Sequence, residues 1–379
     1  MKLIYITNTR LPSEKANSYQ SMQMCYSFSK VFNEVELWTG KARNTKELEK
    51  VKDVFKYYNV EKTFFIRKFF QFDSKFLFNI NEFTWANLRD FIFSINACLS
   101  LIKYKNSPET VVYTRVWYIL YVFLFFKKVG LVNNKIFFES HKFSEFLLKP
   151  LSKIDGVVVI NHYLNSLYEE QNIKNLFVAH DGVNIDEYKH ISKYKFIPNK
   201  EEYTIVYTGS LFSWKGVNTL VDSLQYLSGN IKLICIGGSG QYLTDFKDYV
   251  QSNPEFERVT ITPHVPKIEL MNYIEQADVL VLPNSAKDKM SLYTSPIKMF
   301  EYMASNRPIV ASSIPSIKEV LSDMDNAILC APDNPLNLAN KIQYALDNDC
   351  TLITKKALAN VQEYAWDKRA NNIAKFMSS

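Results

Sequence analysis

Short apolar runs alternate with longer amphipathic stretches along the whole chain. In the first half the apolar runs are KLIYIT, VELWTG, TVVYTR, KIFFES and GVVVIN, and one amphipathic stretch extends from Tyr19 to Phe32. After a polar stretch at 190–202 the alternation resumes with TIVYTG, IKLICIG, VTITP, DVLVLP and PIVAS. Strands that alternate with helices are typical of βαβ units around a parallel sheet. The pattern therefore predicts an α/β chain with two Rossmann-like halves and a boundary near 190–200.

The length of the chain agrees with two domains, because 379 residues is about twice the length of a typical domain. The longest apolar run, from Val116 to Phe126, is far shorter than the roughly 20 residues that a membrane-spanning helix needs. The first residues, MKLIYITNTR, turn polar too early for a signal peptide and predict a buried first strand. We therefore expect no segment that crosses a membrane.

Positive charge sets the first half of the chain apart, and the chain as a whole is rich in aromatic residues. Residues 1–190 contain 26 Lys and Arg against 19 Asp and Glu, whereas 191–379 contain 19 against 20, and aromatic residues make up 15% of the chain. A cationic surface attracts nucleic acids, anionic membranes and anionic substrates alike. Nucleic-acid binding is disfavoured, because the basic residues are dispersed among acidic ones and no known binding module is present.

The five cysteines are widely spaced and include no Cys-x-x-Cys pair. That number and spacing argue against a disulfide framework and against a zinc site, and they favour a reducing cytoplasm. The pairs Asp323/Asp325 and Asp347/Asp349 could suggest a metal site, but we expect helix caps and loops to account for them.

Polar residues and glycines follow many of the predicted strands. Ligands of parallel sheets bind beyond the carboxyl ends of the strands, so these positions are the first candidates for a binding site. The residues that follow the apolar runs are Arg115, Ser140 and His141, Asn161, Gly209 and Ser210, Gly237 and Gly238, and His264.

The stretch LYTSPIKMFEYMASNRPIVAS, at 292–312, predicts a helix that begins at an anion site. Ser295 suits an N-cap and Pro296 suits the first helical position. The unpaired N–H groups and the positive dipole end of such a helix favour a diphosphate. Glu301 can accept hydrogen bonds from the two vicinal hydroxyls of a ribose, and Lys298 can project near the same face. The alternative is an ordinary helix start followed by a solvated glutamate.

Two further loops suit a nucleotide. In YTGSLFSWKGVNTL, at 207–220, Gly209 allows close approach to a phosphate and Lys215 supplies a charge, although an ordinary surface lysine would fit the same pattern. ICIGGSG, at 234–240, is similar to a dinucleotide fingerprint but has Leu243 in place of the last glycine. That departure disfavours NAD, and we expect Gly238 to let a base approach the backbone.

Together these stretches resemble the family-four glycosyltransferases of the GT-B fold. The resemblance extends over nearly the whole chain: NTRLPSEKANSYQSMQM, VVVINHYLNSLYEEQNIKNLFVAHDGVNIDEY, TGSLFSWKG, VTITPHVPKIELMNYIEQADVLVLPN, SPIKMFEYMASNRPIVAS and YAWDKRANNIAKF. It implies an N-terminal acceptor-side domain at 1–190 and a nucleotide-sugar-binding domain at 191–360 that face each other across a cleft. It also implies a C-terminal helix at 361–379 that crosses back to the first domain.

The same resemblance implies the activity. A sugar would pass from a nucleotide-diphosphate sugar to a glycan or lipid-linked acceptor with retention of configuration, without a metal or another cofactor. Charge on the leaving diphosphate would be stabilised by Lys215 and by the helix start. The usual setting of the family is bacterial surface polysaccharide biosynthesis, in the cytoplasm or at the inner face of the membrane.

Site residues are carried over by position in the matching segments. Glu301 matches the acid that grips the ribose, Lys215 a basic residue at the diphosphate, and His141 a histidine near the reacting sugar. The donor-binding set is Gly209, Ser210, Gly238, His264, Val265, Thr294, Ser295 and Lys298, and the acceptor side includes Asn17 and Arg115.

Some positions depart from the family pattern. Tyr293 replaces an acidic residue that often lies eight positions before the glutamate, and Ser210 replaces a frequent arginine. Residues 15–18 replace the usual glycine pair of the N-terminal loop. The diphosphate would therefore depend more strongly on Lys215, helped by Lys298.

The stretch TFFIRKFFQFDSKFLF, at 63–78, places Phe65, Phe69, Phe72 and Phe76 at helical spacing. Such a helix either packs into the core or lies on an anionic membrane. Two other functions remain open: a nucleotide-sugar epimerase of the same fold, and a non-catalytic binding subunit that resembles a glycosyltransferase.

Overall fold

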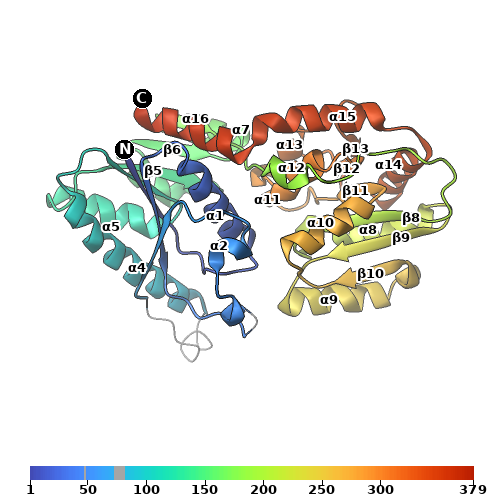
Figure 1. The fold of residues 1–379 in the computed structure, drawn as a ribbon, viewed down its shortest axis with the longest axis horizontal. Coiled ribbons are helices and arrows are strands. Elements are labelled where there is room, and N and C mark those ends of the chain that lie inside the picture. Colours follow the sequence, from blue (N-terminus) through green and yellow to red (C-terminus); the bar gives the residue numbers. More distant parts are fainter. Residues whose placement is uncertain (47, 72–81) are drawn as a thin grey trace. The chain divides into compact units, whose positions relative to one another are not determined.

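The computed structural model describes residues 1–46, 48–71 and 82–379, which form two compact units (Figure 1). The first unit comprises Met1–His180 and Trp366–Ser379, and the second comprises Asp181–Ala365. Each unit is built around its own parallel sheet.

The first unit contains a seven-stranded sheet in the order β3-β2-β1-β4-β5-β6-β7, in which every pair is parallel. The strands are β1 (Lys2–Ile6), β2 (Glu34–Gly40), β3 (Phe65–Phe69), β4 (Thr110–Thr114), β5 (Lys135–Ser140), β6 (Gly156–Val159) and β7 (Leu176–Val178). β4 and β6 are buried along their whole length, because helices cover both faces of the sheet. This explains why these strands are continuous apolar runs.

Helices of the first unit come from both ends of the chain. They are α1 (Ala16–Phe28), α2 (Val54–Tyr57), α4 (Glu82–Leu101), α5 (Trp117–Lys128), α6 (Leu148–Leu151), α7 (His162–Glu170) and α16 (Trp366–Ser378). α4 and α5 lie side by side, and α16 packs against α1 (Figure 1). Asp367 on α16 accepts hydrogen bonds from Ser27 and Lys30, both at 2.7 Å.

The second unit contains a six-stranded parallel sheet in the order β10-β9-β8-β11-β12-β13. The strands are β8 (Tyr203–Thr208), β9 (Ile231–Ile236), β10 (Val259–Thr262), β11 (Val279–Leu282), β12 (Ile309–Ser312) and β13 (Ile328–Cys330). The strand order reverses between β8 and β11, and a parallel sheet binds its ligands in the crevice at such a switch point.

Eight helices of the second unit connect or cover these strands. They are α8 (Val217–Ser223), α9 (Gly240–Gln251), α10 (Lys267–Gln276), α11 (Met290–Tyr293), α12 (Ile297–Ala304), α13 (Pro315–Lys318), α14 (Pro335–Asp347) and α15 (Thr351–Asn360). α12 follows the long connection that leaves β11, so its first turn begins near the switch point.

The predicted fold class is confirmed: two Rossmann-like parallel sheets make up the chain. The polar stretch 190–202 lies inside the second unit, where Tyr188 and Ile191 pack into the core with Met299. The chain passes between the units at His180 and Asp181, and again between Ala365 and Trp366.

The predicted Phe-rich helix is wrong where the structure describes it. Phe65–Phe69 is the edge strand β3, paired in register with β2. Phe69 is buried against Trp38 and Phe93, whereas Phe65 is 68% exposed. A spacing of four residues fits one face of a strand as well as one face of a helix, and strand pairing with β2 decided the outcome. Phe72 and Phe76 lie outside the described residues.

All five cysteines are buried free thiols. This agrees with their number and spacing in the sequence, which argue against a disulfide framework. Among residues 1–46, 48–71 and 82–379, no helix combines the length and the apolar character needed to cross a membrane.

A glycine allows the loop that contains Lys215 to pack closely against the residue that follows β11. Gly216 has φ +72° and lies between the 3-10 turn Ser213–Lys215 and α8. A Cβ at this position would lie 1.8 Å from the carbonyl oxygen of Pro283, the residue after β11. Only glycine allows the two loops at the switch point to meet this closely.

We expect Gly216→Ala to lower the free energy of unfolding by more than about 2 kcal/mol, because left-handed strain adds to a backbone clash. Gly130→Ala is the matched control, since Gly130 also has φ +72° but has no atom within 4 Å of its Cβ position. Urea unfolding of both variants would measure the difference. Equal losses would show that the contact with Pro283 does not constrain the loop.

Candidate functional site

Two lysines lie together at the switch point of the second sheet. The Nζ atom of Lys298, on α12, lies 3.7 Å from the centre of the Tyr207 ring, and that of Lys215 lies 3.8 Å from the centre of the Trp214 ring. In the part of the chain that the structure describes, neither ammonium group has an ion-pair partner, and Lys298 Nζ has no hydrogen-bond partner. The rings of Trp214 and Tyr207 are therefore the immediate neighbours of the two ammonium groups.

Burial and mutual repulsion disfavour the charges of these lysines. Burial lowers the pKa of Lys215 to about 7. Burial, and then the charge of Lys215, hold the pKa of Lys298 well below its usual range. An anion between the two ammonium groups would remove this electrostatic cost. The pair therefore forms a strong candidate anion site.

Hydrogen bonds hold α12 against the end of β8. The N–H of Thr208 donates to the Tyr302 hydroxyl at 2.8 Å. α12 begins at Ile297, with Pro296 at the N-cap position and no side-chain cap. The expectation that Ser295 caps this helix is wrong, because its hydroxyl instead accepts a hydrogen bond from the N–H of Asp181 at 2.9 Å. The helix start still leaves backbone N–H groups without intrahelical acceptors.

Glu301 is buried on α12 and forms an ion pair. Its side chain accepts a hydrogen bond from Lys267, at the start of α10, and Lys267 also donates to the Tyr188 hydroxyl at 2.8 Å. Glu301 is only 7% exposed, so this partner compensates a charge that would otherwise be costly. The second carboxylate oxygen adds acceptor capacity for the hydroxyls of a ligand.

Asn284 is a polar residue that the sequence reasoning missed. It follows Pro283 directly after β11, is 1% exposed, and neither polar atom of its amide has a hydrogen-bond partner among the described residues. A buried amide without partners is costly, and a ligand could satisfy it. Its position just after a strand was the signal that could have identified it. Lys267 was also missed, because its partner Glu301 is distant in the sequence.

The remaining donor-side candidates lie in the loops around these residues. A Cβ on Gly209 would lie 3.7 Å from Cδ of Lys298, and the Ser210 carbonyl accepts a hydrogen bond from Tyr207 at 2.7 Å. Thr294 is buried between α11 and α12. A Cβ on Gly238 would overlap Leu211, so packing within the protein explains this glycine.

The loop after β10 lies two strands from the lysine pair. His264 is exposed there, whereas Val265 packs against the hydrophobic core of the second unit. β10 pairs with β9, and the Thr262 carbonyl accepts a hydrogen bond from the N–H of Gly237 at 2.9 Å. The structure thus groups Gly209, Lys215, Lys298 and Glu301 and places His264 in a neighbouring loop.

In the first unit, the candidates gather around the buried carboxylate of Glu139. His141 donates through Nε2 to Oε1 of Glu139 at 2.6 Å, and Gln20 donates to the same oxygen at 3.0 Å. Arg115 in turn donates to the Gln20 side chain. Asn17 is in the first turn of α1, one turn before Gln20. These contacts bring His141 and Arg115 into one polar network at the carboxyl ends of β4 and β5.

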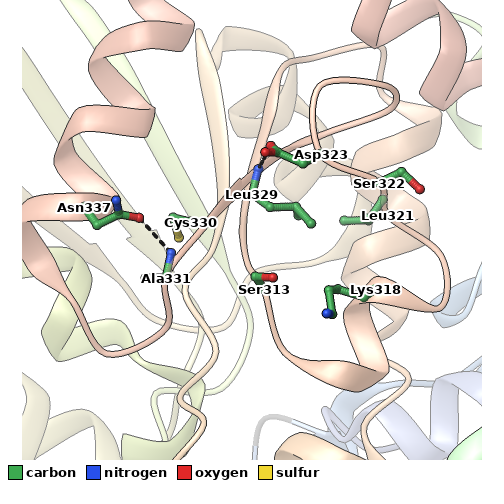
Figure 2. Close-up of a pocket in the computed structure, with 9 residues that line it drawn as sticks. All are labelled: Ser313, Lys318, Leu321, Ser322, Asp323, Leu329, Cys330, Ala331 and Asn337. Carbon is green, nitrogen blue, oxygen red and sulfur yellow. Dashed lines mark hydrogen bonds between the residues drawn. The ribbon is translucent and has the colours of Figure 1, made fainter.

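A pocket of about 640 Å³ lies at the edge of the second sheet, beside the carboxyl ends of β12 and β13 (Figure 2). Its polar side chains hold the local backbone: Asp323 accepts from the N–H of Leu329, and Asn337 accepts from the N–H of Ala331, both at 2.7 Å. The pocket contains none of the donor-side candidates. Within the described ranges, no group of three or more His, Cys, Asp or Glu side chains is arranged to hold a metal ion.

Comparison of the sequence with known proteins shows which proteins the chain is similar to. Residues 202–348 match the family described as glycosyl transferases group 1. An uncharacterized glycosyltransferase of Methanocaldococcus jannaschii is 23% identical over 56% of this chain, and the match spans about half of that relative, 55% of its length. An uncharacterized glycosyltransferase of Haemophilus influenzae is 22% identical over 74% of this chain and 79% of its own length. The chain is therefore related to glycosyltransferases.

Solved structures show the fold of the whole chain. The Anabaena protein HepE, crystallised with UDP and glucose, has a TM-score of 0.73 at 14% identity and covers 100% of this chain and 99% of its own. TarM of S. aureus has a TM-score of 0.74 at 11% identity, with 100% of both chains covered. The two Rossmann-like units thus have the GT-B fold of these glycosyltransferases.

We expect Lys267→Met to lower the free energy of unfolding by about 3–5 kcal/mol, because it leaves the buried charge of Glu301 without its partner. The double variant Lys267→Met/Glu301→Gln should recover most of this loss, because it removes both charges. Denaturant unfolding of the two variants would measure the recovery. If the double variant is no more stable than the single one, Lys267 does not compensate Glu301.

Proposed function

We propose that the protein is a glycosyltransferase that moves a sugar from a nucleotide-diphosphate sugar to a glycan or lipid-linked acceptor. The second unit would hold the donor, and the first would contribute to the acceptor side. The observation that carries this proposal is the lysine pair at the switch point, because the buried Lys298 and the partly buried Lys215 have no ion-pair partner among the described residues. A diphosphate supplies the missing negative charge.

The lysine pair and the start of α12 suit the diphosphate of a donor. Lys298, on α12, lies near Gly209, and it would take the place of the arginine that many family members have where this chain has Ser210. Backbone N–H groups in the first turn of α12 add hydrogen-bond donors that favour phosphate. Charge that develops on the leaving diphosphate would be stabilised by these fixed groups.

Glu301 suits the ribose of the donor, and Asn284 suits the sugar that is transferred. The carboxylate of Glu301, oriented by Lys267, would accept hydrogen bonds from the ribose hydroxyls. The unpartnered amide of Asn284 both donates and accepts, so it can bind a sugar hydroxyl. Since Tyr293 replaces the acid that often contacts the sugar, Asn284 is our candidate for part of that contact. His264 and Val265 would lie beside the base.

The reaction that we propose retains configuration through attack on the same face of the sugar. The acceptor oxygen forms a bond to the anomeric carbon while the bond from that carbon to the diphosphate oxygen breaks. The acceptor proton passes to the leaving diphosphate, so no carboxylate nucleophile is required. His141, with Asn17 and Arg115, would bind the donor sugar or the acceptor. No step of this reaction calls for a metal or another cofactor.

Uridine diphosphate is the first nucleotide to test, because HepE was crystallised with UDP and with UDP-glucose. We propose a hexosyl or N-acetylhexosaminyl donor and a role in bacterial surface polysaccharide biosynthesis. A nucleotide-sugar epimerase would convert the donor in the absence of an acceptor, and a non-catalytic subunit would bind it unchanged. Product analysis with and without acceptor separates these three functions.

We expect UDP, among UDP, GDP, CMP and ADP and their sugars, to raise the melting temperature of the protein. Lys215→Met and Lys298→Met should each weaken diphosphate binding about 10- to 100-fold, the value of one charge-assisted hydrogen bond. Affinity should also fall as the pH rises above 7, because Lys215 of the free protein loses its proton there. Titration calorimetry in two buffers would detect the uptake of protons on binding.

Lys232→Met is the control for charge, since Lys232 is an exposed lysine of β9 in the same unit. It should bind the nucleotide as the wild-type protein does. Equal affinity in Lys215→Met, Lys298→Met and the control would show that the lysine pair is not the diphosphate site. Full transfer by Glu301→Ala would contradict the role of Glu301 in donor binding.

We also propose that the first unit lies on an anionic membrane through an aromatic face of α4 and α5. Ring contacts connect Phe91 to Tyr118 and Trp117 to Phe146, with centroids 6.0 and 5.2 Å apart. Phe125 is 61% and Phe146 53% exposed. An exposed aromatic cluster of this kind is typical of interaction surfaces, and Trp and Tyr favour the membrane interface.

Charge favours a bilayer as the occupant of the aromatic face. Lys128 is exposed on α5, one turn beyond Phe125 on the same side of the helix. Residues 117–153 include six lysines against two acidic residues, the buried Glu139 and the exposed Glu145. Basic residues beside apolar ones bind anionic lipid surfaces. A membrane would also supply a lipid-linked acceptor.

We expect the wild-type protein to float with vesicles that contain phosphatidylglycerol and not with neutral phosphatidylcholine vesicles. Phe125→Ser/Phe146→Ser should abolish flotation, because it removes apolar area from the face. Ile268→Ser/Leu352→Ser is the control, since both residues are exposed apolar residues of the second unit, at 76% and 81%. Unchanged flotation of the first variant, or no flotation of the wild type, would contradict the membrane proposal.

A further inference from the structure

A buried charge network reaches from the C-terminal helix to His141. Glu139, the residue before the end of β5, is 1% exposed. Its Oε1 accepts hydrogen bonds from Gln20 and His141, and its Oε2 accepts from the Tyr113 hydroxyl and pairs with Arg369 at 3.2 Å. Four donors thus fix both oxygens of one carboxylate.

The carboxylate is ionised in the folded protein. Burial alone would oppose ionisation, but the Arg369 charge and the hydrogen bond from His141 hold the pKa of Glu139 well below its usual range. An ionised carboxylate cannot donate a proton, so the hydrogen bond at 2.6 Å requires the proton on Nε2 of His141. When the imidazole is neutral, its lone pair is then on Nδ1.

Arg369 anchors the network through α16. Its Nε donates to the His180 carbonyl at 2.8 Å and its Nη2 to the Ala179 carbonyl at 3.3 Å, while Nη2 also pairs with Glu139. Arg369 is 5% exposed, and the planar fork of its guanidinium permits these contacts at the same time. Arg369 therefore fixes Glu139 to the segment at which the chain leaves the first unit.

We infer that Glu139, held by Arg369 of the C-terminal helix, is a positioning residue that fixes the ring and the tautomer of His141 for its contact with the substrate. The inference rests on the proposed function for the identity of that substrate. The side chain of His141 is 25% exposed, so the ring reaches the surface at the carboxyl ends of the strands where ligands bind. Glu139 itself is inaccessible and acts through the histidine alone.

The tautomer of His141 can be read in the wild-type protein without any substrate. The chain has five histidines, so labelling with ¹⁵N-histidine yields few imidazole signals, and His141→Gln assigns the relevant one. The ¹⁵N chemical shifts distinguish a protonated nitrogen from one with a lone pair. We expect the Nε2–H tautomer at neutral pH. A neutral Nδ1–H tautomer would overturn the inference even if Glu139 variants fail to fold.

A double-mutant cycle tests the same inference through activity. Glu139→Gln should lower kcat about 10- to 100-fold with little change in the KM for the donor, because a misdirected ring impairs the reacting geometry. In a His141→Ala background the same substitution should have almost no further effect on kcat. Glu109→Gln, at an exposed glutamate of the same unit, is the control. An equal loss in both backgrounds would overturn the inference.

The two measurements separate this inference from the proposed function. If no donor supports transfer but the Nε2–H tautomer is present and is lost in Glu139→Gln, the proposed function fails and the positioning by Glu139 stands. If transfer occurs and Glu139→Gln leaves both the tautomer and kcat unchanged, the proposed function stands and the positioning fails.

Discussion

The cost of burying a charge shapes the carboxyl ends of both sheets. In the first unit, Glu139 is compensated within the protein by Arg369 and by three further donors. In the second unit, Glu301 is compensated by Lys267, whereas Lys215 and Lys298 have no carboxylate partner among the described residues. Since a charge that is shielded from water and has no partner is costly, we expect an anion bound between these two lysines to stabilise the fold.

The sequence predicted the parallel sheets because their central strands are continuous apolar runs. It also located Lys215, Lys298 and Glu301, since residues after strands and at helix starts are visible in a pattern. It missed the short edge strands β7 and β13 and misjudged β3, where strand pairing determines structure more than periodicity does. The role of Ser295 was wrong for a related reason: its partner, the N–H of Asp181, is distant in the sequence.

Partners from distant segments also explain what the sequence could not reveal about the candidate site. Lys267 is 34 positions before Glu301, and Arg369 is 230 positions after Glu139, so no local pattern links either pair. Asn284 is different, because its position after β11 was visible, but only the structure shows that its amide is buried and unpartnered. Local spacing therefore identified the residues that we propose bind the donor, and the fold identified the residues that hold them in place.

The first unit is discontinuous, and this has a consequence for synthesis on the ribosome. Residues 1–180 emerge first, but Arg369 and the rest of α16 emerge only after the entire second unit. Until then, Glu139 lacks the cation that compensates its burial, and α1 lacks the helix against which it packs. The sheet of the first unit is thus translated before the second unit, but the first unit can be completed only after α16 has been translated.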